Sequence, residues 1–295
     1  MNFPDKTAIA PYSPACVLRA KGPDAYSFLQ SQFTNDLGKM TTDGSIYGLW
    51  LDRRGRVVAD SWVARMGAPD EILIVSIDCP ASVVDAHLQA HIVADEVEVA
   101  DETPQWKAMA LVGPGIGPRS AGAGVMLRGR RGAAEGLEWL VPAVEWPVVL
   151  SATRGLSRAA PGDLELMRIR ARVPRVLQDI GPADIPNEGG LDRDAISYSK
   201  GCYTGQEVMA RVRALGRVRR VLVHVEGPGG PPATPAALWS GGLRTGEIRS
   251  AAPNAQGFEG LALVQVPPAA AYALESDSPP QVSVKASGAG SLDSV

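Results

Sequence analysis

A thiol, a primary amine and a carboxylate occur together between Lys200 and Glu207, where the sequence reads Lys-Gly-Cys-Tyr-Thr-Gly-Gln-Glu. Cys202 is the nucleophile or metal ligand of this segment, because a thiolate can act as either. The spacing of Thr204 and Glu207 is that of a capping box and predicts a helix that begins at Gly205. Cys202 would then precede a helix N-terminus, where the helix dipole and the charge of Lys200 both favour the thiolate.

The same segment also fits a structural interpretation, in which Cys202 is buried and unreactive in a tight turn. Free cysteines are among the residues most often buried. The charged, glycine-rich setting favours a reactive thiol instead. The segment alone leaves both interpretations open.

A carboxylate interrupts an apolar pattern in the expected strand 56–65. Val58, Asp60 and Trp62 share one face of that strand by its two-residue period. A carboxylate between two apolar neighbours lies either at a sheet end in solvent or in a pocket with a polar ligand. The strand pattern alone leaves both positions of Asp60 open.

Arginines are concentrated after the cysteine segment. They fit either a solvated helix face or a clamp for carboxylates or phosphates, which suits the planar guanidinium. The cluster comprises Arg211, Arg213, Arg217, Arg219 and Arg220.

Two histidines, His87 and His91, are four residues apart on an expected helix. They lack the glutamate of a zincin motif and an evident third ligand, so we expect no metal site.

The overall composition describes an ordinary globular protein. The 295 residues are 45% hydrophobic and 21% charged, with a formal net charge of -3, which argues against a general nucleic-acid binder. Three scattered cysteines fit a reducing compartment. We expect no signal peptide in the first 15 residues, no membrane-spanning helix and a cytoplasmic location.

Apolar periodicity predicts an α+β fold in which helices cover one face of antiparallel sheets. Helices are expected from Asp24 to Gly38, over 81–91, from Pro161 and over 205–214. Strands are expected at 15–20, 45–51, 56–65, 71–77, 96–100, 106–112, throughout 125–150 and at 218–226. The stretches 113–124 and 173–199 are expected to be loops, and the Gly/Ser-rich end, 287–295, to be disordered.

Short apolar segments separated by Gly/Pro turns follow residue 226 and predict a small β-barrel. We expect two interleaved modules over 1–225, one of 1–44 with 115–225 and the other of 45–114. The barrel is then expected over 226–286.

The segment Lys200 to Glu207 resembles the signature of YgfZ-like folate-binding proteins, relatives of the glycine cleavage T-protein, an aminomethyltransferase. The resemblance extends to 28–36, to 51–60, to 186–191 and to the glycine-spaced C-terminal segments. It implies a T-protein-like fold with a ferredoxin-like module, a C-terminal barrel and a central hole that holds folate. In that fold Asp60 falls on the carboxylate that a hairpin delivers to the folate.

The resemblance also implies the remaining ligand residues. Glu188 would accept two hydrogen bonds from the pterin edge, and Arg219 and Arg220 would receive the glutamate tail. Lys200 and Tyr203 of the motif are expected to contact the same tetrahydrofolate, or a one-carbon derivative of it. Asp60 and Cys202 are the expected chemical groups.

Three functions remain open at this point. The first is a tetrahydrofolate-binding accessory protein for iron–sulfur cluster assembly or repair, with Cys202 as its functional thiol. The second is a folate-dependent aminomethyl transferase that acts on a small amine or in tRNA modification. The third is a binding module in which Cys202 is structural.

The expected partners are folate, transient iron–sulfur assembly or client proteins and tRNA, and the protein is expected to be a monomer without a membrane partner. Arg249 stands where T-proteins usually have a small hydroxyl residue. Glycine cleavage with a lipoyl carrier is therefore not expected.

Overall fold

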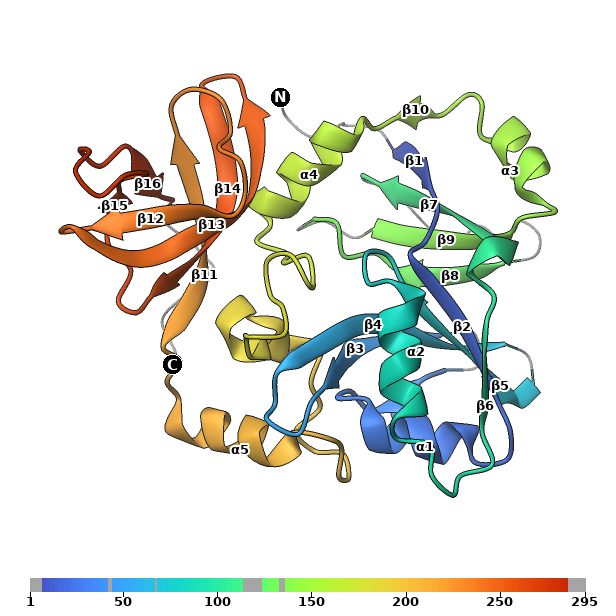
Figure 1. Ribbon diagram of the computed structural model, residues 1–295. Coiled ribbons are helices and arrows are strands. Elements are labelled where there is room, and N and C mark those ends of the chain that lie inside the picture. Colours follow the sequence, from blue (N-terminus) through green and yellow to red (C-terminus); the bar gives the residue numbers. More distant parts are fainter. Residues whose placement is uncertain (1–6, 42–43, 67, 114–123, 133–135, 286–295) are drawn as a thin grey trace.

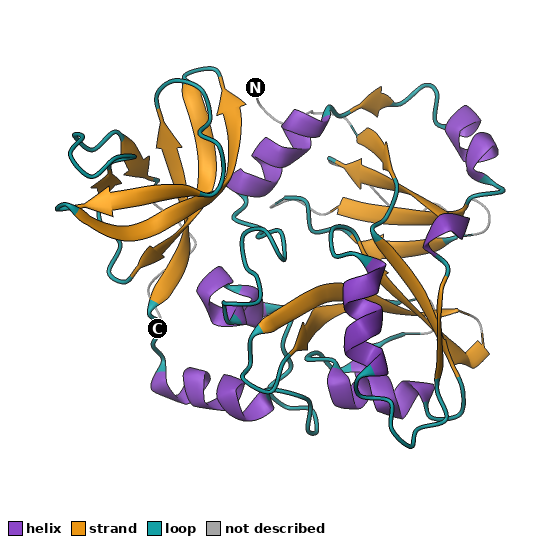
Figure 2. Ribbon diagram, in the orientation of Figure 1, coloured by secondary structure: helices purple, strands orange, loops and turns teal. Residues whose placement is uncertain are grey.

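The computed structural model describes residues 7–41, 44–66, 68–113, 124–132 and 136–285. The chain forms three β-sheets that are joined and partly covered by short helices (Figures 1 and 2). Most of the expected loop 113–124 and all of the expected disordered tail 287–295 lie outside the described residues.

The first sheet carries the candidate carboxylate. Its strand order is β3-β4-β5-β2-β6, and every neighbouring pair is antiparallel. Two helices pack on one face of it (Figure 1), which buries an apolar core that includes Leu29, Trp50 and Leu88. The elements are β2 (Cys16–Lys21), α1 (Ala25–Gln32), β3 (Ser45–Leu51), β4 (Val57–Met66), β5 (Ala68–Ser76), α2 (Ala81–Gln89) and β6 (Glu98–Asp101).

The second sheet has the order β10-β1-β7-β9-β8, with β10 parallel to β1 and the other pairs antiparallel. Two helices follow β9 in the chain, one before β10 and one after it. The elements are β1 (Ala8–Tyr12), β7 (Trp106–Val112), β8 (Val125–Arg128), β9 (Gly136–Pro142), α3 (Trp146–Ala152), β10 (Ser157–Arg158) and α4 (Pro161–Arg170).

The strands are grouped differently from the modules expected from the sequence. The strand Cys16–Lys21 was assigned with 1–44 and 115–225, but it lies between β5 and β6 and completes the first sheet. It belongs there because its apolar side chains Val17 and Leu18 are fully buried in that core. The first sheet therefore takes residues from 16–101, and the second joins β1 to 106–158.

The third sheet is the expected C-terminal barrel, with the order β12-β13-β14-β11-β16-β15. A bridge between Trp239 and Ala273 joins its two end strands and nearly closes it. It begins at Arg220, six residues before the expected boundary, because β11 pairs with β14 along its whole length. The strands are β11 (Arg220–Gly227), β12 (Ala236–Ser240), β13 (Leu243–Asn254), β14 (Gly257–Gln265), β15 (Ala271–Tyr272) and β16 (Val282–Val284).

One helix prediction and one strand prediction are wrong in their extent. The first helix ends at Gln32 and not at Gly38, because Phe33 turns extended and the Thr34 side chain ties the chain to Leu49 N and Ala195 O. The end of 125–150 is the helix α3 rather than a strand, with a proline in its first turn. The loop at 173–199 contains two short 3-10 turns, η3 (Pro186–Gly189) and η4 (Leu191–Arg193).

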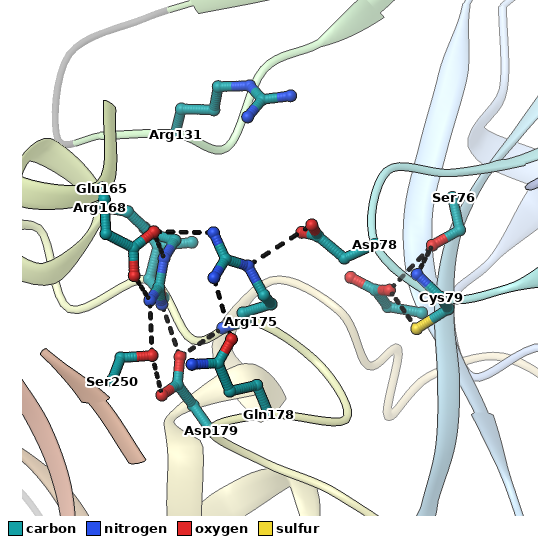
Figure 3. Close-up of polar contacts among 12 residues, drawn as sticks. Ser76, Asp78, Cys79, Arg131, Glu165, Arg168, Arg175, Gln178, Asp179 and Ser250 are labelled. Carbon is teal, nitrogen blue, oxygen red and sulfur yellow. Dashed lines mark hydrogen bonds and ion pairs between the residues drawn. The ribbon is translucent and has the colours of Figure 1, made fainter. Parts of the chain in front are cut away.

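Buried ion pairs attach the barrel to the rest of the chain. Arg168 of α4 donates to Asp179 over 2.5 Å and to Ser250 of β13 over 2.7 Å, and Ser250 donates to Asp179 (Figure 3). All three side chains are buried. The barrel is therefore docked through specific polar contacts, each with a partner.

Candidate functional site

A cavity of about 430 Å³ lies between the first sheet and the loop that follows α4. One wall comes from β3 and β4 through Tyr47, Asp60 and Trp62, and the opposite wall includes Arg168 and Arg175. Figure 3 shows Arg175 between Glu165 on one side and Asp78 on the other. This volume is within the range of pockets that hold small organic ligands. We call it the central cavity.

Asp60 lies in the wall of the central cavity because of its place in β4. Asp60 and Trp62 both line the cavity, which confirms the shared face predicted from the strand period. Three donors hold its carboxyl group: the Tyr47 hydroxyl over 2.8 Å, the Ser76 hydroxyl over 3.2 Å and the Cys79 thiol over 3.1 Å. The alternative of a solvated sheet end is excluded by these contacts.

The surroundings of Asp60 favour its protonated form. Burial raises the pKa of Asp60 above its ordinary value, although hydrogen bonds from Cys79 and Tyr47 act in the opposite direction. Burial, followed by the nearby Asp60 charge, raises the pKa of the Tyr47 hydroxyl and of the Cys79 thiol. Both donors therefore favour their protonated forms, and Asp60 is the group at this wall placed to hold or release a proton.

Cations complete the cavity wall. The Arg131 guanidinium lies 4.6 Å from the centre of the Tyr12 ring and pairs with the buried Glu138 over 2.7 Å. Arg130 stacks on the Tyr47 ring at 3.8 Å and pairs with Asp194. These aromatic and cationic surfaces suit a flat ligand that carries negative charge.

A second cavity of about 420 Å³ shares a wall with the first. The two have Tyr47, Trp62, Arg130 and Val173 in common. The stacked pair of Arg130 and Tyr47 therefore stands between two halves of one recess.

The segment Lys200–Glu207 lies outside both halves of this recess. Cys202 is exposed and follows an exposed Gly201, whereas Tyr203 is buried with 6% of its surface exposed. No residue of the segment is among those that line the two cavities in the described part of the chain. The motif thiol is thus accessible to solvent, and the alternative in which Cys202 is buried in the turn is wrong.

The capping box predicted from Thr204 and Glu207 does not form. The helix α5 (Gln206–Leu215) begins after Gly205, which has a φ of 84°, and no side chain caps it. Thr204 instead donates a hydrogen bond to the side chain of Gln32 over 2.9 Å.

Two glycines bring α5 against the β3–β4 hairpin. A Cβ atom on Gly205 would lie 2.8 Å from the Asp52 carbonyl oxygen, and one on Gly55 would lie 2.8 Å from the side chain of Met209. Both positions also have a positive φ. Only glycine meets both demands, so this contact places the motif directly beside the hairpin that carries Asp60.

Lys200 holds the motif to the end of α1. Its ammonium group donates to the carbonyl oxygens of Gln30 and Phe33, each over 2.5 Å, and of Asn35 over 3.2 Å. Burial lowers the pKa of Lys200 to about 8. The amine is therefore engaged with backbone, and the geometry does not favour the folate contact or the thiolate activation predicted for it.

Glu188 is also engaged within the protein. Its carboxylate accepts two hydrogen bonds from Arg220, each over 2.9 Å, and one from the Ile185 backbone N–H over 3.1 Å. Arg220 and Arg249 both pair with the buried Asp184, which joins this turn to the barrel.

Glu188 and Arg220 are not among the residues that line the central cavity, and Arg219 is exposed. The structure therefore does not bring Glu188, Arg219 or Arg220 to Asp60. Their predicted contacts with folate stay predictions, and for Glu188 and Arg220 the geometry favours a structural role.

Tyr47, Ser76 and Cys79 are site residues that the sequence reading missed. Tyr47 could have been predicted from the sequence, because the hairpin turn at 52–55 places it opposite Trp62 and next to Asp60. Cys79 and Ser76 arrive from β5 and the turn after it, so they depend on the order of strands in the sheet.

Comparisons with known proteins agree with this fold. The family model described as the GCVT N-terminal domain matches residues 6–116. The crystal structure of the glycine cleavage system aminomethyltransferase T from Bartonella henselae superposes with a TM-score of 0.78 and 18% identity. The match covers 95% of this chain and 85% of that chain.

Three curated relatives are similar over most of the chain. The human mitochondrial iron-sulfur cluster assembly factor IBA57 is 28% identical over 277 residues, which cover 84% of this chain and 74% of that protein. The tRNA-modifying protein YgfZ of Serratia proteamaculans is 27% identical over 263 residues, covering 80% and 77%. The aminomethyltransferase of Moorella thermoacetica is 29% identical over 234 residues, covering 69% and 62%.

The three-sheet fold, with a nearly closed six-stranded barrel at its end, defines an aminomethyltransferase-like architecture. The matches above make the chain similar to YgfZ, to IBA57 and to aminomethyltransferases, which agrees with the resemblance drawn from the motif at Lys200–Glu207. Among the described residues no helix is long and apolar enough to cross a membrane. The human relative is named as mitochondrial, and the cytoplasmic location expected for this chain stays a prediction.

Proposed function

We propose that this protein binds tetrahydrofolate in the central cavity and serves iron–sulfur cluster assembly or repair through the exposed thiol of Cys202. The observation that carries the folate half is Asp60, whose carboxyl group is held by three donors at the wall of a cavity of about 430 Å³. The relatives named for iron–sulfur cluster assembly support the second half.

The residues of the cavity fit a reduced folate. Asp60 would hold or take a proton at the ring nitrogens, Tyr47 would keep the carboxyl group oriented, and Arg175 or Arg131 would attract the anionic tail. Tetrahydrofolate, when bound, would supply the N5 and N10 nitrogens, which can carry a one-carbon unit. Trp62 lines the same wall and would help to exclude water from the ring.

The position of Cys202 favours an accessory role over group transfer. A transferase that used this thiol would need it in reach of the folate, but Cys202 lies outside both cavities. An exposed thiol can instead meet a partner protein. Among the described residues no group of three or more possible metal ligands is present, so a cluster held at Cys202 would take its other ligands from that partner.

A folate-dependent aminomethyl transferase is the second candidate, because Asp60 is placed for proton transfer beside the cavity. In that case the acceptor, a small amine or a tRNA, would enter the cavity, and Cys202 would be dispensable. The two candidates therefore differ in their need for the thiol.

Complementation of a deletion strain with Cys202→Ser tests the proposal. We expect the variant to fold, to bind tetrahydrofolate like the wild type and to fail to restore the activity of iron–sulfur enzymes. Cys16→Ser is a matched control at a buried cysteine outside the cavity. When its expression level is adjusted for any loss of stability, this variant should restore the activity of the iron–sulfur enzymes. Full rescue by Cys202→Ser would overturn the role of the thiol and favour the transferase.

A further inference from the structure

The second sheet contributes a charged pair to the central cavity. Ala10 and Tyr12 share a face of β1, and both line the cavity. Ala10 lies opposite Ala110 of β7, which lies opposite Glu138 of β9, so the Glu138 side chain is on the same face of this sheet. Glu138 is buried, with 1% of its surface exposed, and pairs with Arg131, which lines the cavity. The pair therefore lies at the cavity wall.

Glu138 and Tyr12 fix the Arg131 guanidinium along its edge and across its face. Nε of Arg131 donates to Oε1 of Glu138 over 2.7 Å, and Nη2 donates to Oε2 over 3.4 Å. The flat group also lies over the Tyr12 ring, 4.6 Å from its centre. A two-point contact of this kind sets the direction in which the remaining N–H donors point. Glu138 is thus placed to position Arg131, although it does not itself line the cavity.

Arg131 has room for a second carboxylate. Arg168 and Arg175 of the same cavity each pair with two carboxylates, whereas Arg131 pairs with one among the described residues. A guanidinium has five N–H donors, and Glu138 takes two of those of Arg131. In Figure 3 the Arg131 side chain extends from the loop after β8 and contacts none of the other residues drawn. Donors of Arg131 are therefore left for an anionic group of a ligand.

Arg130 also has a single carboxylate partner, but its setting differs. Its partner Asp194 has a side chain that is 55% exposed, and the Tyr47 ring covers one face of its guanidinium. An ion pair that water reaches contributes little. The buried partner of Arg131 makes that residue the better site for an anion.

We propose that Arg131 binds the carboxylate tail of the ligand in the central cavity and that Glu138 positions it there. This assignment rests on the proposed folate site and fixes how the ligand lies in it. The ring end meets Asp60 on the first sheet, and the anionic end meets Arg131, which the second sheet holds. The tail then lies away from Arg219 and Arg220, which do not line this cavity.

The experiment compares two ligands by tryptophan fluorescence, with Trp62 in the cavity wall as a reporter. One ligand is tetrahydrofolate, and the other is its diamide, in which neutral amides replace both carboxylates of the tail. The readout is the ratio of the two affinities, because a general loss of folding or of ring binding affects both ligands alike. The wild type should favour tetrahydrofolate by roughly tenfold or more, the effect of one charge-assisted hydrogen bond.

Two variants of the pair carry the test. Arg131→Met/Glu138→Gln removes both charges together, because a buried charge that has lost its partner destabilises a fold. The ratio of affinities should fall close to one in this double variant. Glu138→Gln alone keeps the side-chain volume and one oxygen acceptor but loses the two-point contact. Its ratio should lie between those of the wild type and the double variant, and an unchanged ratio would overturn the positioning role of Glu138.

Arg154→Ala is the matched control, since Arg154 is exposed and lines neither cavity, and it should keep the wild-type ratio. Arg175→Ala should keep it as well. A ratio that falls in Arg175→Ala but not in the double variant would assign the tail to Arg175 and overturn the proposal.

The same titrations separate this assignment from the proposed function. If the wild type does not bind tetrahydrofolate, the proposed folate site and this assignment are both wrong. If it binds tetrahydrofolate with a ratio near one, or with a ratio that the double variant leaves unchanged, the assignment of the tail to Arg131 alone is wrong.

Discussion

The thiol of Cys79 donates a hydrogen bond to Oδ1 of Asp60 over 3.1 Å, from the turn that follows β5. The contact joins a buried cysteine to the one carboxyl group of the β4 wall that faces the central cavity. It favours the ionised form of Asp60 against the effect of burial. Cys79 is therefore a positioning residue for Asp60, although the thiol itself does not line the cavity.

Removal of this donor should raise the pKa of Asp60 further. In Cys79→Ala the carboxylate loses a hydrogen bond, so the pH at which Asp60 titrates should move up, as measured by carbon NMR of a labelled aspartate. Cys79→Ser keeps a donor and should restore most of the wild-type value. An unchanged pKa in Cys79→Ala would show that the thiol has no influence on Asp60.

Asp60→Asn should stabilise the ligand-free protein at neutral pH. The raised pKa of Asp60 means that the folded state prefers the neutral acid, so the stability that this group contributes is present below its ordinary pKa and is lost as pH rises through the raised value. Asparagine cannot ionise, so the variant does not lose this stability as pH rises.

The advantage of Asp60→Asn in the free energy of unfolding should therefore grow from pH 4 to pH 8, measured by urea denaturation. A difference that is constant with pH would contradict the assigned direction of the shift.

Lys200→Met should destabilise the fold without weakening folate binding. The substitution leaves the carbonyl oxygens of Gln30 and Phe33 without their buried donor, which costs roughly 1–3 kcal/mol. Lys107→Met is the matched control, because Lys107 bonds the exposed Ser13 and should cost less than about 0.5 kcal/mol. A loss of tetrahydrofolate affinity in folded Lys200→Met would restore the ligand role predicted from the sequence.

Gly205→Ala should lower the free energy of unfolding by about 1–3 kcal/mol, because it combines a strained positive φ with a Cβ atom 2.8 Å from the Asp52 carbonyl. Gly201→Ala, in the same segment, meets no atom within 4 Å and should change it by less than about 0.5 kcal/mol. Equal costs at the two positions, in thermal or denaturant unfolding, would contradict the close approach of α5 to the hairpin.

The sequence was sufficient where a feature depends on local periodicity. The cavity face of Asp60 followed from the alternation in 56–65, and the C-terminal barrel followed from short apolar segments between Gly/Pro turns. These patterns depend on residues that are close in the sequence, and in this structure no distant contact overrides them.

Features that depend on contacts between residues far apart in the sequence could not be predicted. Glu188 is paired by Arg220, which lies 32 residues later on a barrel strand, and Lys200 is held by carbonyls of the first helix. The spacing of Thr204 and Glu207 gave a capping box, but the Asp52 carbonyl allows only a left-handed glycine at position 205. In each case a tertiary contact overrides the local pattern.

The most direct test is a tetrahydrofolate titration of the wild type, Asp60→Ala and Glu188→Gln, followed by tryptophan fluorescence, to which Trp62 in the cavity wall contributes. Loss of one charge-assisted contact is worth about 1.5–3 kcal/mol, so Asp60→Ala should bind roughly 10- to 150-fold more weakly. The carboxylate of Glu188 pairs with Arg220, so Glu188→Gln should bind tetrahydrofolate with the affinity of the wild type. Wild-type affinity in Asp60→Ala, with lost affinity in Glu188→Gln, would contradict a folate site in the central cavity.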